Sequence, residues 1–360
     1  MQNGPLQGVK LIEMDAIGPV PLCGMILSGL GADIVRITRP SGGGAWDDLG
    51  EAVLLRGRTE VQLNLKSDEG RQAVLDLVSK ADGLLEGARP GVMERLGLGP
   101  AECLAANPRI VYGRMTGWGQ QGQLSQSAGH DLNYIAMTGA LHGIGKKDEP
   151  PQVPLNIIGD YAGGTMFLAL GVVSAIMAAR STGKGQVVDT AMVDGVANLL
   201  AMYHAWLATD NWVDEAGSNL LDGRAPYYRC YTCKCGGSVA VGSLEPQFYA
   251  LLIEGLGLPA DRFVQHDKAQ WPEMEAEFTR IFASATRDEW EKRFAGTDAC
   301  VSPVLSMCEA MDHPVNVERG VFIEHNGVKQ AAPAPRFSET GGSIRDGSTV
   351  SIEAALKAWS

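Results

Sequence analysis

The sequence predicts an α/β fold in which a large domain with a mainly parallel sheet precedes a smaller α+β domain. Over the first 190 residues, short apolar runs typical of strands alternate with helical patterns, as expected of βαβ units. Around residue 225 this alternation ends, and "PYYRCYTCKCGGSVAVGSL" indicates two antiparallel strands about a glycine turn. The 45 glycines of the 360-residue chain suit a fold with many tight turns and ligand-holding loops.

The elements of the large domain follow one another in regular order. Strands are expected at 8–14, 34–40, 61–65, 83–87 and 109–117. Helices are expected at 21–33, 67–82, 91–97 and 100–107, near Asp131, after Asp160 and over 194–209. Ser67 is a candidate N-cap for the second of these helices, because Asp68 and Glu69 occupy the first turn.

The second half of the chain contains the smaller domain and a returning tail. After the hairpin at 226–244, helices are expected at 247–257, 271–284 and 287–296. The Pro/Gly-rich "PAPRFSETGG" predicts a strap that returns to the first domain. The expected division is a large domain at 1–190 plus 325–360, linker helices at 191–225 and a small domain at 226–318.

Composition and charge restrict the functional classes. A hydrophobic content of 45% and a charged content of 20% are typical of a folded globular protein, and the net charge of −12 argues against nucleic acid as the main partner. The N-terminal stretch has no signal-peptide pattern, the C-terminus has no Ser-Lys-Leu address, and seven scattered cysteines suit a reducing compartment. We therefore expect a cytoplasmic protein. The uncharged stretch 161–179, bracketed by Asp160 and Arg180, is expected to be a core helix rather than a membrane span.

Three local motifs were tested against the chemistry they suggest. "GWGQQG", residues 117–122, matches G-x-G-x-x-G but opens no apolar helix and has no acidic residue about 20 positions on, so a flexible ligand-covering loop is favoured over a nicotinamide site. "CYTCKC" supplies Cys230, Cys233 and Cys235 without the second ligand pair that a structural zinc site needs. No G-x-S-x-G elbow is present for a serine nucleophile.

Basic residues gather near the ends of the predicted strands in the first hundred positions. They are Arg36, Arg39, Arg56, Arg58, Lys66, Arg89 and Arg95. Open α/β sheets bind ligands at the carboxyl ends of their strands, so arginines there suit a phosphate-bearing molecule. The alternative is a set of solvated surface charges.

His130 and Asp131 stand side by side in "SAGHDLNYIA", and Asp160 precedes the long apolar helix. Neighbouring helical residues point in different directions, so Asp131 is not expected to orient His130. A catalytic histidine usually needs a carboxylate partner, which must then come from elsewhere, and the alternative is a structural polar residue. Asp160 is either an N-cap, a functional carboxylate at a helix N-terminus, or both.

Several motifs together resemble those of the family III CoA-transferases, and in particular its 2-methylacyl-CoA racemase branch. They include "LLEGARPGVMERLGLG", "SAGHDLNYIAMTG", "NIIGDYAGGTMFLALG", "GKGQVVDTAMVDG" and "VGSLEPQFY", and they extend over essentially the whole chain. The resemblance implies a Rossmann-like large domain completed by the C-terminal strap, an acyl-CoA ligand and an interlocked homodimer. The active site would lie between the large domain of one subunit and the small domain of the other.

The resemblance also assigns roles to residues. It implies that His130 and Asp160 are the two acid/base residues and that Glu245, supplied by the second subunit, pairs with the histidine. The candidate coenzyme A contacts are Arg39, Arg56, Arg89, Arg95, Gly129 and Tyr134. The expected reaction is racemisation at C2 of a 2-methylacyl-CoA by two-base proton transfer through an enolate, with backbone N–H groups near residues 129–131 as candidate enolate donors. No metal or redox cofactor is expected, and coenzyme A is part of the substrate.

Asp131 keeps an alternative open. It aligns with the aspartate that the family's transferases use as nucleophile, through a mixed anhydride with the acyl group, whereas His130 occupies a position where transferases generally have another residue. The segment "LLRGRTEVQLNLK" departs from the family's usual Asn-Arg-Gly-Lys-like pattern at Gly57 and Arg58, which weakens the expected nucleotide contacts of Arg56 and Arg58. A CoA-transferase is thus the alternative enzyme, and a non-catalytic acyl-CoA binder is the alternative from another class.

Overall fold

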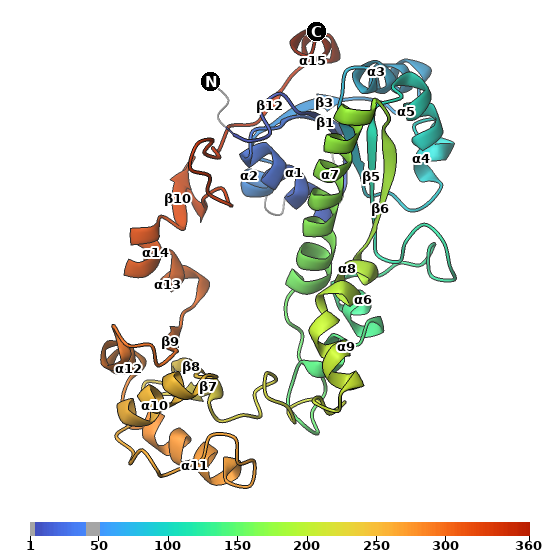
Figure 1. The fold of residues 1–360 in the computed structure, drawn as a ribbon. Helices are drawn as coiled ribbons and strands as arrows, with labels where there is room; N and C mark the ends of the chain where they lie inside the picture. Colours follow the sequence, from blue (N-terminus) through green and yellow to red (C-terminus); the bar gives the residue numbers. More distant parts are fainter. Residues whose placement is uncertain (1–3, 41–50) are drawn as a thin grey trace. The chain divides into compact units, whose positions relative to one another are not determined.

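The computed structural model describes residues 4–40 and 51–360, which form two compact units (Figure 1). The first unit comprises Met1–Ala140, Pro154–Ala201 and Pro314–Ser360. The second comprises Leu141–Val153 and Met202–His313. The segment expected to link two domains, 191–225, is therefore divided between the units, and a short earlier segment joins the second. Residues 1–3, which belong to the N-terminal stretch without a signal-peptide pattern, lie outside the described residues.

A seven-stranded parallel sheet forms the centre of the first unit, in the order β12-β3-β2-β1-β4-β5-β6. The strands are β1 (Lys10–Met14), β2 (Asp33–Thr38), β3 (Arg58–Gln62), β4 (Gly83–Glu86), β5 (Val111–Thr116), β6 (Gln186–Ala191) and β12 (Ser348–Thr349). Apart from β12, the strand order β3-β2-β1-β4-β5-β6 is the Rossmann order, in which the direction of strand addition reverses between β1 and β4. The predicted α/β fold class with its Rossmann-like sheet is confirmed.

The two edge strands of the sheet were not predicted from the sequence. β6 and β12 are the outermost strands, and neither forms a continuous buried run, because most of their residues face solvent. The strand expected at 61–65 is displaced to Arg58–Gln62. That expectation was wrong because Arg58 is buried in the strand by an ion pair with Glu13, so the strand starts on a charged residue.

Helices cover both faces of this sheet (Figure 1). Apolar side chains of α1 (Pro19–Gly29) and α7 (Met166–Thr182) pack against one face, in a cluster that includes Leu27, Leu168 and Val172. The helices on the other face are α3 (Asp68–Val78), α4 (Val92–Arg95), α5 (Pro100–Ala106) and α15 (Ile352–Ala358). As predicted, the Ser67 side chain caps α3 by accepting the Gly70 N–H.

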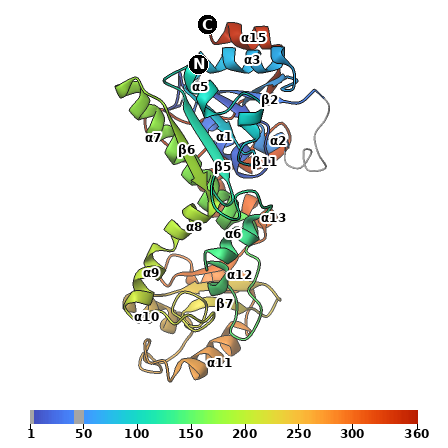
Figure 2. The ribbon, with the colours of Figure 1, turned by 90° about the vertical axis from the view of Figure 1, so that its right-hand side faces the viewer.

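The C-terminal segment returns to the first unit as predicted. A hairpin of β10 (Phe322–His325) and β11 (Val328–Ala331), which the sequence did not suggest, precedes the strap. β12 then pairs with β3, and α15 lies beside α3 (Figure 2). Trp359 fastens this end, because its indole Nε1 donates to Asp33 Oδ2 (2.9 Å) and its carbonyl accepts from Lys10 Nζ (2.7 Å).

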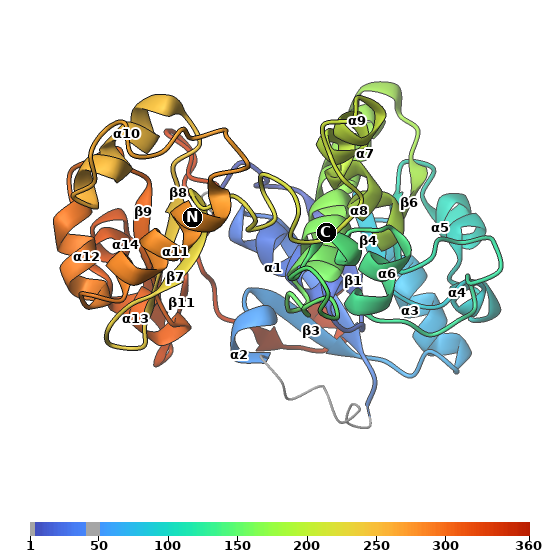
Figure 3. The ribbon, with the colours of Figure 1, turned by 90° about the horizontal axis from the view of Figure 1, so that it is seen from below.

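The second unit is built on a three-stranded antiparallel sheet (Figure 3). The predicted hairpin is β7 (Tyr228–Thr232) and β8 (Ser238–Gly242), and β9 (Val301–Val304), which was not predicted, adds the third strand. The predicted helices are α10 (Pro246–Gly255), α11 (Trp271–Phe282) and α12 (Arg287–Phe294), and they enclose an aromatic core. The shorter helices of the chain are α2 (Glu51–Leu54), α6 (Asp131–Met137), η1 (Leu141–Gly143), α8 (Met192–Leu199), α9 (Ala201–Ala208), α13 (Met307–Asp312) and α14 (Pro314–Arg319).

The long apolar helix begins with π-helical turns. Residues Ile157–Thr165 form η2, and the chain continues directly as α7. The combined helix, Ile157–Thr182, is long and apolar enough to cross a membrane, but half of its most apolar stretch is buried within the protein. Because α7 packs against β5 and β6, we interpret it as a core helix with one exposed face.

Candidate active site

A cavity of about 390 Å³ opens at the carboxyl end of the sheet, beside the paired strands β1 and β4, where the strand order reverses. Its wall consists of the segments that follow β1, β4 and β5, together with Gly129, His130, Tyr134, Asp160 and Met192. Crevices at such reversals of strand order are where open α/β sheets bind ligands. The fold therefore brings His130 and Asp160, which are 30 positions apart in the chain, to one cavity.

His130 reaches this cavity from the start of α6. It is the N-cap residue, with extended backbone angles, and its N–H donates to Asn133 Oδ1 (3.0 Å). His130 lines the cavity and remains exposed. Because its own N–H is bonded to Asn133, the backbone of His130 is not a donor for an enolate oxygen.

Asp160 lies in the first turns of η2 and lines the same cavity as His130. It is not the N-cap that sequence analysis considered, because the helix starts three residues earlier and Asn156 takes that position. Asn156 Nδ2 donates to Asp160 Oδ2 (3.2 Å). Burial raises the pKa of Asp160, the nearby Asp131 charge adds to this, and the Asn156 hydrogen bond and His130 oppose it. A carboxyl group with a raised pKa is suited to both accepting and donating a proton.

Asp131 does not orient His130, as the i, i+1 spacing predicted. Its carboxylate is buried and accepts the backbone N–H groups of Gly159 (2.6 Å) and Asp160 (2.8 Å). The adjacent pair thus differs in its surroundings at the start of α6, because His130 lines the cavity and the Asp131 carboxylate is bonded to η2.

Tyr134, on α6, lines the same cavity as His130. Its hydroxyl donates to the Gly129 carbonyl, and its ring meets that of Trp118 edge-on at 4.8 Å. A Cβ at Gly117 would lie 2.1 Å from the Tyr134 ring, so the "GWGQQG" loop depends on glycine for this contact. Burial raises the pKa of Tyr134 to about 12, which keeps its hydroxyl protonated as a donor.

A second cavity, of about 720 Å³, lies along the same edge of the sheet. It is lined by the ends of β1 to β4 and includes Arg39 and Lys66, and it shares Gly87 and Ala88 with the first cavity. Glu86 fixes this shared segment, because its Oε2 accepts the Ala88 N–H (2.6 Å) while Arg114 Nε holds its Oε1 (2.9 Å). Adjacent cavities, one of them bordered by cations, suit a ligand with an acyl part and a phosphorylated part.

The other arginines named as coenzyme contacts differ in their surroundings. Arg89 is exposed and lines the first cavity. Arg95 is exposed on α4 and is not among the residues that line either cavity. Arg56 is buried, and its Nη1 is bonded to Gln330 Oε1 and the Ala331 carbonyl, so it ties the C-terminal hairpin to the large unit. Arg56 Nη1 is thus bonded within the protein, and Arg56 is not among the residues that line either cavity.

Glu245 belongs to the second unit, whereas His130 and Asp160 belong to the first. It is the N-cap residue of α10, but its exposed side chain makes no capping hydrogen bond. The segment before it is held firmly, because Gln265 Nε2 donates to the carbonyls of Ser243 (3.1 Å) and Leu244 (2.8 Å). An exposed carboxylate on a fixed segment is available to a partner.

The remaining motifs take structural positions. Cys230 and Cys235 are exposed and Cys233 is buried in the β7–β8 hairpin, and within residues 4–40 and 51–360 no group of three potential metal ligands occurs.

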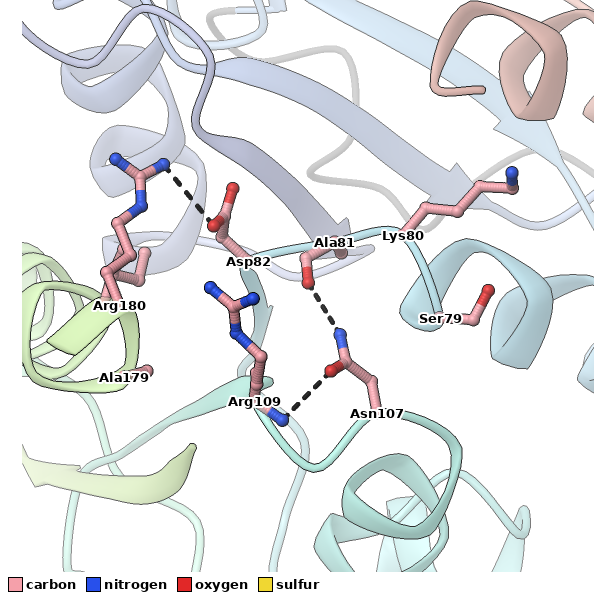
Figure 4. Close-up of a pocket in the computed structure, with 9 residues that line it drawn as sticks. Ser79, Lys80, Ala81, Asp82, Asn107, Arg109, Ala179 and Arg180 are labelled. Carbon is pink, nitrogen blue, oxygen red and sulfur yellow. Dashed lines mark hydrogen bonds and ion pairs between the residues drawn. The ribbon is translucent and has the colours of Figure 1, made fainter. Parts of the chain in front are cut away.

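A separate cavity of about 250 Å³ lies at the amino end of the sheet (Figure 4). Its polar groups bond one another, since Asn107 holds the Ala81 carbonyl and Arg180 pairs with Asp82. We assign it a structural role.

Three residues of the site were missed from the sequence. Asn156 stands four positions before Asp160, a spacing that brings side chains together on a helix, and this was the one available signal. Glu86 and Arg114 lie on separate strands and meet only through the sheet register. No local pattern indicates such a pair.

Comparison with known proteins identifies the family of the chain. The sequence matches the model of CoA-transferase family III over residues 6–348. The chain belongs to this family. It is 43% identical over 338 residues to the alpha-methylacyl-CoA racemase of Homo sapiens and 42% identical over 337 residues to that of Mus musculus, which covers 93% of this chain and 87% of each relative. The crystal structure of a CAIB/BAIF family protein from Brucella suis superposes with a TM-score of 0.82 at 26% identity, over 99% of both chains. The family III fold inferred from the motifs is therefore confirmed.

Proposed function

We propose that the protein is an alpha-methylacyl-CoA racemase, which interconverts the two configurations at C2 of a 2-methylacyl-CoA thioester. The observation that carries this is the placement of His130 and Asp160 on one cavity at the switch point of the sheet. The mammalian relatives named as this enzyme support the substrate class. A CoA-transferase is less favoured, because the side chain of its required nucleophile, Asp131, is bonded to backbone N–H groups.

Racemisation requires a proton to leave one face of C2 and another to arrive on the opposite face. One residue of the pair, His130 or Asp160, removes the α-proton, and the C–H electron pair passes into an enolate with the thioester carbonyl. The other residue then protonates C2 from its own side, and exchange of roles reverses the reaction. Each positioned acid or base is typically worth about 10²–10⁴ in rate. This chemistry needs no metal or redox cofactor.

Coenzyme A serves as the handle of the substrate in this proposal. Arg39 and Lys66 on the larger cavity supply positive charge for its phosphates, and Arg89 on the smaller cavity adds a third cation. The thioester and C2 then lie beside Gly129, His130 and Tyr134. Remote binding energy of this kind is used to hold the reacting carbon between the two bases.

The decisive test is hydrogen exchange in D₂O with one enantiomer of a 2-methylacyl-CoA and no second acid. We expect one deuterium at C2 together with inversion, measured by mass spectrometry and chiral analysis. A transferase instead requires an acceptor acid and forms an acyl adduct that hydroxylamine traps. Absence of exchange across short, long and sterol-type branched chains would rule out the racemase.

A homodimer with a shared active site completes the proposal. Glu245 is exposed on the second unit, and the face of α7 that does not pack against the sheet presents Met166, Leu170 and Met177 to solvent. A second copy that covers this apolar face would supply Glu245 to His130 of its partner, where it would fix the imidazole tautomer.

All seven cysteines are free thiols, which supports a reducing, cytoplasmic location.

The shared site predicts complementation between inactive subunits. His130→Ala and Glu245→Ala homodimers are each expected to lose inversion at C2, since each site lacks one member of the pair, and inversion is the activity measured here. Hybrids prepared by mixed refolding contain one intact site and should recover up to half of the wild-type activity per hybrid dimer. Hybrids without activity would show that Glu245 does not act across subunits.

A further inference from the structure

The carboxylate of Asp131 lies under the first turns of η2, the helix that carries Asp160. It is 4% exposed, and its Oδ2 accepts the N–H groups of both Gly159 and Asp160. These N–H groups lie at a helix start, where the backbone has no intrahelical acceptor, and a charged acceptor makes the stronger kind of hydrogen bond. A Cβ at Gly159 would lie 2.9 Å from Oδ2, so the close approach depends on glycine at this position.

Through this contact, the position of Asp160 depends on the same helix start that positions His130. His130 is the N-cap of α6, and Asp131 is the first residue of the same helix. The Asp131 side chain bonds the backbone of Asp160 itself, and α6 packs against η2. The start of α6 therefore holds the imidazole directly and the Asp160 carboxylate through one intervening hydrogen bond.

The same geometry is unsuited to covalent catalysis by Asp131. Oδ2 is bonded to two N–H groups, and Oδ1 is buried with no hydrogen-bond partner among the residues that the structure describes. Gly129, His130, Tyr134 and Asp160 line the cavity, but Asp131 is not among its lining residues. A nucleophile needs an oxygen that reaches the thioester carbon, and neither oxygen does so in this conformation.

We infer that Asp131, the residue that the family's transferases use as nucleophile, is a positioning residue here that holds Asp160 at the cavity in register with His130. The inference rests on the proposed racemase function. It makes the retained aspartate part of the racemase machinery through the backbone of Asp160, without contact with the substrate.

The charge of Asp131 gives a readout that a purely structural role would not produce. The groups that face Asp160 are Asp131 and His130 on α6, Asn156 at the start of η2, and the Tyr134 hydroxyl near Arg89. Among these, burial and then the Asp131 charge raise the pKa of Asp160. Removal of that charge with retention of an acceptor oxygen should therefore lower the pKa of Asp160.

The test compares Asp131→Asn with Asp131→Ala in the full-length protein. The asparagine carbonyl oxygen still accepts both N–H groups, so exchange in D₂O should stay within about 10-fold of wild type, and the acid limb of its kcat/KM profile should move to lower pH. The alanine variant lacks the acceptor, and kcat should fall about 10²-fold with little change in KM, as misplacement of a catalytic group by about 1 Å predicts. Asp261→Asn, on an exposed position of the second unit, is the matched control and should leave both quantities unchanged.

Amide hydrogen–deuterium exchange over Ile157–Thr165 separates this inference from the proposed function. Asp131→Ala should speed amide exchange of that segment at least 10-fold, and Asp131→Asn should change it much less. If Asp131→Asn loses turnover as completely as Asp131→Ala while the segment stays protected, Asp131 acts chemically and the inference is wrong. If the wild type itself exchanges no substrate, the proposed function fails, and the amide exchange pattern alone decides whether Asp131 holds Asp160.

Discussion

Replacement of His130 or Asp160 by alanine is expected to lower the rate of inversion at C2 by at least about 10²-fold, the usual contribution of one positioned acid or base. Both residues line the same cavity and come from separate elements, α6 and η2. Inversion needs a proton to leave one face and another to arrive on the opposite face. With either base missing, one of these two transfers has no donor or acceptor.

The two variants should differ in the exchange that they retain. A single remaining base still removes the proton of the enantiomer that faces it and returns a solvent deuteron to the same face. His130→Ala should therefore exchange one enantiomer without inversion, and Asp160→Ala should exchange only the other. His142→Ala, on an exposed position of the second unit, is the control and should behave as wild type. Variants that exchange both enantiomers, or that still invert, would contradict a two-base mechanism.

The largest expected loss of stability follows from replacement of Arg58 by alanine. Arg58 Nε lies 3.1 Å from Glu13 Oε2, and the two side chains are 2% and 0% exposed. Breaking a buried pair by removing one partner costs about 3–5 kcal/mol. Arg36 Nε, 3.6 Å from Glu13 Oε1, remains as a second cation beside the carboxylate, so we expect a loss toward the lower end of this range. Arg58 also donates to the carbonyls of Arg56 and Pro21, which then lose a donor.

Urea unfolding at neutral pH measures this effect, with Arg71→Ala as the matched control. Arg71 pairs with Asp68 at the surface, where an ion pair contributes about 1 kcal/mol or less. Burial already raises the pKa of Glu13, and loss of Arg58 removes an opposing attraction, so this pKa rises further. The folded variant then binds a proton more tightly than the unfolded chain, and the stability deficit should shrink as the pH is lowered toward the ordinary range of glutamate. Equal losses for the two arginine variants would contradict a buried-pair role.

Arg58 and Arg56 also show why the sequence overestimated the basic ligand site. Their positions near a strand end predicted phosphate contacts, but both guanidinium groups are turned inward. Arg58 pairs with Glu13 of β1, and Arg56 is bonded to the C-terminal hairpin. The sequence shows where arginines lie along the chain. It does not show whether an arginine forms an ion pair with a buried carboxylate or a hydrogen bond with a carbonyl far away in the sequence.

Local patterns determined the fold class and most of the strands and helices, because alternation and caps are properties of neighbouring residues. The candidate acid/base residues came from the resemblance of the motifs to those of family III. The edge strands β6, β9 and β12 could not be found from local patterns, since their pairing comes from strands far away in the chain. The meeting of His130 with Asp160 at one cavity and the bond from Asp131 to the backbone of Asp160 were likewise decided only in the folded chain. The physical reason is that a side chain has a direction only once its helix has packed: the adjacent His130 and Asp131 look like partners in sequence, yet α6 turns one to the cavity and the other to η2.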